Sequence, residues 1–423
     1  MGIIKEILTE YKQKKLASNI VFLALTQIVN VLFPLILVPY LVRVLGSESW
    51  GKFSFVQAII AYFVLIVDYG FNISATQRVA VSAKDTPSLR NVFYNVINAK
   101  ILLTVISLLT LTIITFTVPK FAQEWRMYLL MTMMIVGYTL YPQWFFQGIE
   151  KMGYITIINI AIKTIYLILT LCLIKTPDDY TLAAGLMGVS FLIPGIVSFI
   201  IARNMVGGHH TFSMPGILFM LKDGFPVFLS SAMSSVLYSS AIVFVGFITT
   251  DAITGGYAAM DKLIKAIILV FYPITTAIYP KVSKALSENE KDGINLIVKL
   301  SIPVLLLTLL LMAFFYFTED YIVTLLFTSE FIQYTPIFNW LLIWMFFSVL
   351  NNFIGVQYMT ASNRKSQYAT AFLIAGVGTI ILFPILIKEF SAAGASIAIL
   401  CGEVSLTLIM LLMILLSRRS QHE

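Results

Sequence analysis

Three charged residues in one apolar segment are the first candidates for chemistry. Asp261, Lys262 and Lys265 lie in the run from Gly255 to Pro280, which is long enough to cross a bilayer as a helix. At the rise of an α-helix, Lys265 would lie about 15 Å into that span, close to the membrane midplane. An ionisable group at that depth costs about 2.5 kcal/mol or more unless it faces a partner or water.

Two interpretations of these charges remain open. Asp261 and Lys265 are four residues apart and share a helix face, so they could form a salt bridge buried between helices. Lys262 points elsewhere and has no partner within its own segment, which favours a wet, cationic cavity through the protein.

Two further charges are expected at a similar depth in other spans. Lys163 would lie about 15 Å into a span at 153–174, and Glu403 about 16 Å into one at 392–416. Together with Lys265 they would make a mostly cationic chamber with one carboxylate. Such a chamber favours an anion, above all a diphosphate, which ammonium groups neutralise as point charges. The alternative pairs Glu403 with a lysine of its own bundle.

Charges at the ends of the first two spans complete the candidate set. Arg43 and Lys52 flank the first outer turn and are predicted substrate contacts, with Lys163, Lys262 and Lys265. Asp68 and Arg78 lie at the inner end of the second span. Asp68 could be a gate or a proton-titrated group, or it could cap a loop or pair with Arg78. For ion coupling or gating the candidates are Asp68, Arg78, Asp261 and Glu403.

The elements that position these residues are predicted to be membrane helices. Hydrophobic residues make up 59% of the 423 residues and charged residues 12%, and the mean hydropathy is +0.91. Long unbroken apolar runs indicate an all-α, polytopic membrane protein rather than an outer-membrane barrel. About twelve transmembrane helices are expected, at 18–42, 49–70, 91–117, 126–146, 153–174, 181–202, 223–249, 255–279, 294–317, 335–359, 366–387 and 392–416.

Basic residues alternate strongly from one connection to the next. Connections on one side hold most of the lysines and arginines, including Lys281, Lys284 and Lys291, whereas the other side holds few. By the positive-inside rule, this asymmetry places both termini in the cytoplasm.

Weak internal similarity predicts two related halves. Four short matches fall on equivalent span ends: Gly51-x-Phe53 with Gly255-x-Tyr257, Arg78-Val79-Ala80 with Lys281-Val282-Ser283, Gly148-x-x-Lys151 with Ala361-x-x-Arg364, and Ala183-Ala184-Gly185 with Ala392-Ala393-Gly394. We therefore expect an N-terminal six-helix bundle at 1–205, a cytoplasmic linker at 206–222 and a C-terminal six-helix bundle at 223–423. A repeated even unit predicts pseudo-symmetric bundles around a central cavity.

The sequence lacks signatures of several other protein classes. It contains no Gly-x-x-x-x-Gly-Lys-Ser/Thr phosphate loop, no His-Glu-x-x-His and no triad-like set, so catalytic residues, metal ligands and cofactors are all predicted to be none. The net charge of +7 suits loops that face anionic membrane lipids better than nucleic-acid binding.

Several motifs resemble those of a known family. The segments are VPYLVRVLG at 38–46, WGKF at 50–53, VDYGFNISAT at 67–76 and WFFQGIEKM at 144–152. They resemble Wzx-type polysaccharide (O-antigen repeat unit) flippases, of the superfamily that also holds the MATE multidrug exporters and the lipid II flippase. The likeness covers the first half well and the second mainly by span count.

This resemblance implies a function. Such a flippase moves an undecaprenyl-diphosphate-linked oligosaccharide from the cytoplasmic to the periplasmic leaflet of the bacterial inner membrane, by alternating access of two bundles. A polysaccharide polymerase and its chain-length machinery are expected partners. One alternative is a MATE-type proton- or sodium-coupled drug antiporter, for which Asp261 and Glu403 could serve. A non-transporting scaffold for assembly enzymes is another, but it leaves the buried charge unexplained.

Overall fold

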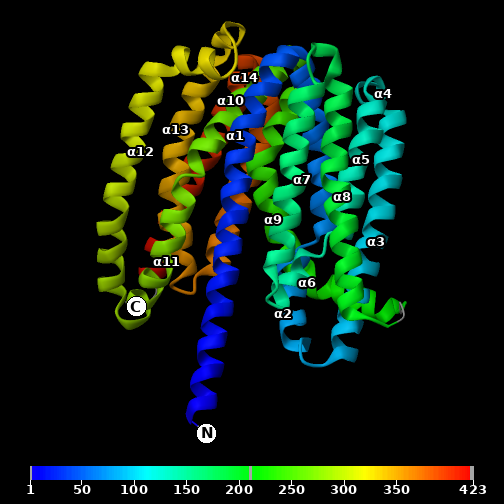
Figure 1. The fold of residues 1–423 in the computed structure, drawn as a ribbon. Coiled ribbons are helices and arrows are strands. Elements are labelled where there is room, and N and C mark those ends of the chain that lie inside the picture. Colours follow the sequence, from blue (N-terminus) through cyan, green and yellow to red (C-terminus); the bar gives the residue numbers. More distant parts are fainter. Residues whose placement is uncertain (1, 209–211, 420–423) are drawn as a thin grey trace. The chain divides into compact units, whose positions relative to one another are not determined.

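The chain is helical throughout the part that the structure describes. The computed structural model describes the backbone of residues 2–208 and 212–419, and the side chains of residues 22, 25, 28, 29, 32–208, 212–233, 235 and 239–417. Its elements are α1 (Gly2–Asp68), α2 (Phe71–Ser82), α3 (Thr86–Thr117), α4 (Pro119–Gln123), α5 (Trp125–Leu140), α6 (Gln143–Gly148), α7 (Met152–Leu173), η1 (Pro177–Asp179), α8 (Tyr180–Val206), α9 (Met214–Ile248), α10 (Asp251–Ile268), α11 (Phe271–Glu288), α12 (Glu290–Leu326), η2 (Ser329–Tyr334), α13 (Thr335–Asn351), η3 (Asn352–Thr360) and α14 (Lys365–Arg419) (Figure 1).

The prediction of a multi-pass, all-α membrane protein is confirmed. Within the described residues, nine segments are long and apolar enough to cross a bilayer. Two of them, Leu32–Ser82 and Lys365–Ser417, each join a pair of spans that the sequence predicted separately. The number twelve and the pseudo-symmetry stay predictions.

In each of these joined segments a single non-helical residue connects the two spans. Gly46, with φ 69°, is the non-helical residue inside α1, and Ser391, with φ 54°, has the same role in α14. One residue with positive φ redirects the chain without a polar loop, and glycine adopts that conformation without steric cost.

The chain divides into two compact units. Unit 1 comprises Met1–Leu37 and Ile59–Ala232, and unit 2 comprises Val38–Ala58 and Met233–Glu423. Residues 38–58 of α1 therefore belong to the unit built mainly from the second half of the chain. Between the described ends of α8 and α9, residues 209–211 lie outside the described part, and α9 already begins at Met214, inside the predicted linker.

Unit 1 is organised by close helix packing and an aromatic core. α5 lies along α8 (Figure 1), because Gly137 and Gly195 carry no side chain at their contact. A Cβ on Gly195 would lie 2.4 Å from the Gly137 carbonyl oxygen. Small residues at such contacts let membrane helices approach. Phe93 of α3 and Trp144 and Phe146 of α6 are buried in the aromatic core of this unit.

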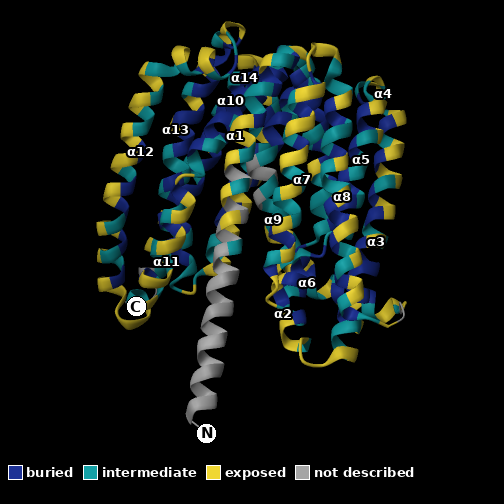
Figure 2. Cartoon of the chain, in the orientation of Figure 1, coloured by how far each residue is buried: buried dark blue, intermediate teal, exposed yellow. Residues whose placement is uncertain are grey.

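In unit 2, α13 packs against α14, and α11 against α12. Much of α12 is exposed along its length (Figure 2), including Leu310, Phe317 and Tyr321. In a membrane protein such an apolar face is suited to contact with lipid.

Helix breaks occur at two places in each half of the chain. The α1–α2 break lies at Tyr69 and Gly70, and α10 ends at Ile268 before α11 begins at Phe271. Two later turns share a backbone bond: the N–H of Lys151 donates to Phe146 and that of Arg364 to Met359, both at 2.8 Å. In each turn the preceding residue, Glu150 or Asn363, has a positive φ.

Candidate functional site

The three charges of α10 are held inside unit 2. Asp261 is buried, and the Lys265 Nζ lies 2.8 Å from its Oδ2. The Lys265 side chain is 35% exposed, against 4% for Asp261. The Lys262 Nζ donates a hydrogen bond of 3.2 Å to the Gln57 Oε1, a neutral acceptor. The three side chains comprise two ammonium groups and one carboxylate, so this stretch of α10 carries a net positive charge.

A close helix crossing brings Gln57 to α10. A Cβ on Gly51 would lie 1.8 Å from the Asp251 carbonyl oxygen, and one on Gly255 would lie 1.8 Å from that of Ser47. The two backbones are therefore in direct contact, as in small-xxx-small pairs of membrane helices. Residues 38–58 are fixed to α10 by this contact.

The predicted substrate contacts Arg43 and Lys52 are also engaged within unit 2. The Arg43 Nε donates to the Leu326 carbonyl oxygen at 2.9 Å, and its Nη2 donates to that of Leu325. A guanidinium at the last turn of α12 satisfies carbonyl groups that have no helical donor. The Lys52 Nζ lies 3.1 Å from Glu48 Oε1. Binding of substrate by either residue stays a prediction.

Glu403 lies in a buried polar network at the junction of α13 and η3. Its exposed fraction is 0%. The Asn351 Nδ2 donates to Glu403 Oε2 at 2.5 Å and to the Glu403 carbonyl oxygen at 2.9 Å, and the Thr407 hydroxyl donates to Asn351 Oδ1 at 2.6 Å. α13 ends at Asn351, where a π-helical stretch begins, and such stretches are frequent at functional sites.

Lys163, Asp68 and Arg78 belong to unit 1. The Lys163 side chain is partly buried, with its Nζ 5.9 Å from the centre of the Phe33 ring. Its predicted place beside Lys265 in one chamber stays a prediction.

The structure corrects the pairing of Asp68 with Arg78. Asp68 accepts a hydrogen bond from Asn72 Nδ2 at 2.7 Å. Arg78 instead forms a two-pronged contact with Asp223, with Nε–Oδ2 at 2.9 Å and Nη2–Oδ1 at 2.8 Å. Its guanidinium also lies 4.6 Å from the centre of the Phe219 ring. Arg78 therefore joins α2 to α9. The contact is bidentate, which is the geometry that a guanidinium and a carboxylate favour.

This ion pair gives a modest, measurable prediction. Arg78 and Asp223 are 38% and 31% exposed, so water screens their attraction. A double-mutant cycle with Arg78→Ala and Asp223→Ala should give a coupling energy of about 1 kcal/mol in thermal unfolding of the purified protein. A coupling energy of zero would show that the contact does not stabilise the join between α2 and α9.

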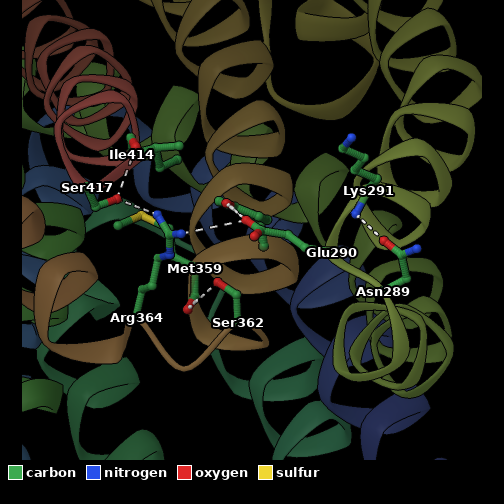
Figure 3. Close-up of polar contacts among 9 residues, drawn as sticks. Asn289, Glu290, Lys291, Met359, Ser362, Arg364, Ile414 and Ser417 are labelled. Carbon is green, nitrogen blue, oxygen red and sulfur yellow. Dashed lines mark hydrogen bonds and ion pairs between the residues drawn. The ribbon is translucent and has the colours of Figure 1, made fainter. Parts of the chain in front are cut away.

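A second polar cluster of unit 2 lies around Arg364 (Figure 3). Arg364 Nη2 lies 3.6 Å from Glu290 Oε1, and its Nη1 donates to the Ser417 hydroxyl at 2.5 Å. The Tyr358 hydroxyl donates to Glu290 Oε1 at 2.7 Å. Glu290 begins α12, where the helix dipole favours an acidic residue. The cluster joins α12, η3 and α14.

Sequence reasoning missed two buried or paired groups in unit 1. Lys100 is 1% exposed and lies within α3, and the depth argument applied to Lys163 would have identified it. Asp223 gives no such signal, because its partner lies 145 residues away in the chain. Within the described residues, no group of three or more His, Cys, Asp or Glu side chains could hold a metal.

Comparison with known proteins identifies the family. The sequence model of the family described as "Polysaccharide biosynthesis protein" matches residues 16–286. The chain belongs to this family. It is 32% identical over 409 residues to a "Putative O-antigen transporter" of Escherichia coli (strain K12). The aligned residues cover 94% of this chain and 96% of that protein. A second protein with this name, from Shigella dysenteriae, is 30% identical over 268 residues, which cover 63% of this chain and 67% of that protein.

Solved structures show the same fold at low identity. The lipid II flippase MurJ, in an inward closed conformation, matches with a TM-score of 0.71 and 14% identity, over 94% of this chain and 87% of that one. An inward-facing MATE multidrug transporter matches with a TM-score of 0.65 and 12% identity, over 90% and 96%. This member of the polysaccharide biosynthesis protein family therefore has the fold of those transporters.

Proposed function

We propose that this protein is a flippase for an undecaprenyl-diphosphate-linked oligosaccharide, such as an O-antigen repeat unit. The cargo moves from the cytoplasmic to the periplasmic leaflet of the inner membrane, by alternating access, and both termini lie in the cytoplasm. The protein is a transporter and not an enzyme. A polysaccharide polymerase with its chain-length machinery would receive the product.

The cationic stretch of α10 carries this proposal. Lys262 and Lys265 outnumber the carboxylate of Asp261, and the three side chains belong to one helix of unit 2. Two ammonium groups at the predicted depth near the middle of a span attract a diphosphate, whereas a surplus of positive charge repels a cationic drug. The names of the relatives support the same cargo class.

The roles of the other candidates follow from this cargo. We also propose Lys163, Arg43 and Lys52 as contacts of the anionic cargo; Lys163 belongs to unit 1, and Arg43 and Lys52 flank the first predicted outer turn. We propose Asp68, Arg78, Asp261 and Glu403 for coupling or gating, because each is a charged group fixed by a specific partner in the structure.

A reconstituted transport assay tests the proposal. Purified protein in lipid vesicles should move a fluorescent polyprenyl-diphosphate-linked oligosaccharide between leaflets, so that an impermeant reductant added outside quenches label that began inside. Vesicles without protein should keep that label protected, since a charged head group crosses a bilayer slowly.

A matched lipid defines specificity in the same assay. A neutral polyprenyl glycoside with the same sugars should move more slowly, because it offers no diphosphate to Lys262 and Lys265. Equal rates for the two lipids would contradict the proposal. Accumulation of cationic drugs by the same vesicles would indicate that the protein is a drug antiporter instead of a flippase.

A further inference from the structure

Gln57 is a polar residue on the stretch of α1 that crosses α10. It is partly buried, and its Oε1 accepts a hydrogen bond of 3.2 Å from the Lys262 Nζ. An ammonium group offers only donors, so the oxygen of the amide and not its nitrogen must face Lys262. Because the two backbones are in contact at Gly51 and Gly255, this pair has a fixed place within unit 2.

The two lysines of α10 are held by acceptors of different charge. The Lys265 Nζ lies 2.8 Å from the Asp261 Oδ2, so a carboxylate compensates that ammonium. The acceptor of Lys262 is an amide oxygen without a formal charge. A lysine ammonium has three N–H donors, so Gln57 takes one and leaves two for another acceptor. One positive charge of this stretch is therefore held in place but not cancelled.

The type of side chain at position 57 decides whether that charge remains. A glutamate has the same length as a glutamine and could accept the same hydrogen bond, but its charge would cancel that of Lys262. The attraction would be substantial, because both residues are partly shielded from water. Two ammonium groups would then be matched by two carboxylates, and this stretch of unit 2 would no longer favour an anion.

We propose that Gln57 positions the Lys262 ammonium for the diphosphate of the cargo and, because it is neutral, sets the preference of this site for anions. Phosphate oxygen atoms take the two remaining donors of Lys262, while the amide keeps the ammonium in place. This inference rests on the proposed function and adds the residue on which the cationic character of the site depends. Gln57 acts through Lys262 and is therefore a positioning residue.

A purely structural role for Gln57 predicts the opposite order of variants. If the amide only satisfies a partly buried lysine, a glutamate should serve at least as well, and a methionine, which is a weak acceptor, should be worse. If neutrality matters, Gln57→Glu should be the damaging change, and Gln57→Met should keep most of the affinity for an anion. The order of the two variants therefore separates the two roles.

Binding of inorganic pyrophosphate to purified full-length protein in lipid nanodiscs tests this order. Isothermal titration at constant ionic strength should give an affinity about 10- to 100-fold weaker for Gln57→Glu than for the wild type, as expected when one charge-assisted hydrogen bond to the ligand is lost. Gln57→Met should lose no more than about fivefold, the effect of one neutral hydrogen bond. Without pyrophosphate, Gln57→Glu should unfold at the wild-type temperature or slightly above it, because it gains an ion pair.

Two further variants show whether the effect depends on charge at this place. Gln333→Glu adds the same negative charge at an exposed residue of η2 and should bind pyrophosphate as the wild type does. In Gln57→Glu/Asp261→Asn the carboxylate moves from residue 261 to residue 57, so Lys265 becomes the ammonium with a neutral neighbour. The affinity of this double variant should return to within about fivefold of the wild type. If Gln57→Glu alone does not fold, the double variant and Gln57→Met carry the test.

Four results would overturn the inference. They are a wild type that does not bind pyrophosphate, a Gln57→Glu variant that binds it as tightly as the wild type, a larger loss in Gln57→Met than in Gln57→Glu, and a double variant that does not bind. The vesicle assay of lipid movement is a separate measurement. Pyrophosphate binding in the expected order without lipid movement would contradict the flippase proposal alone, and lipid movement with any of the four results would contradict this inference alone.

Discussion

Replacing Lys262 by methionine should lower transport of the lipid-linked oligosaccharide roughly 10- to 100-fold, because a charge-assisted hydrogen bond contributes about 1.5–3 kcal/mol. The change removes the ammonium that has a neutral partner, Gln57. The remaining charges, Asp261 and Lys265, then cancel. Amounts of surface polysaccharide in a deletion strain that carries Lys262→Met, together with rates in vesicles, measure the effect.

A lysine at the surface of the same unit provides the control. Lys284 lies 3.8 Å from Glu288, and its side chain is 78% exposed. Lys284→Met makes the same change in net charge and should transport at the wild-type rate. Unchanged transport by Lys262→Met at equal protein level would show that Lys262 is not part of the binding site. Equal losses in both variants would indicate an effect of net charge alone.

Gly255→Ala should be strongly destabilising, although it adds one methyl group. Its Cβ would lie 1.8 Å from the Ser47 carbonyl oxygen, so α10 and residues 38–58 would have to separate. Such overpacking costs about 2 kcal/mol or more, and the contact between Gln57 and Lys262 should weaken as well. The thermal midpoint of the purified protein should fall by several degrees.

Gly378→Ala is the matched control, because a Cβ at this helical position would have no atom within 4 Å. It should be neutral or slightly stabilising, since alanine favours the helix. If Gly255→Ala unfolds at the wild-type temperature, the close crossing of α10 and residues 38–58 does not hold this part of unit 2 together.

The sequence was sufficient for the class of fold because membrane spans depend on local composition. Apolar runs and the positions of prolines are read directly from the chain. The turn at Gly46 was expected between two spans, but a polar loop is not needed there, since one residue with positive φ redirects α1. The assignment of residues 38–58 to unit 2 depends on contacts with α10, and no local pattern reveals it.

The candidate site was likewise predictable only where it depends on local sequence. Depth along a helix singled out Lys163, Lys265 and Glu403 as charges that need compensation, and of these three the structure buries Glu403 fully and the two lysines in part. Partners could be predicted where they were four residues apart, as for Asp261 and Lys265. Those of Arg78 and Glu403 lie on other helices, and only the folded chain shows that they are Asp223 and Asn351.

The membership of residues 38–58 in unit 2 has a consequence for biosynthesis. Gln57 and Ser47 bond with residues that follow 205 and 283 positions later. At bacterial and eukaryotic elongation rates these partners emerge roughly 10–60 s afterwards. Residues 38–58 must therefore stay in the bilayer without their packing partner until α10 is synthesised. During this time the backbone at Gly51 is not covered by α10. A nascent chain arrested before Asp251 would be a natural client for membrane chaperones and quality-control proteases.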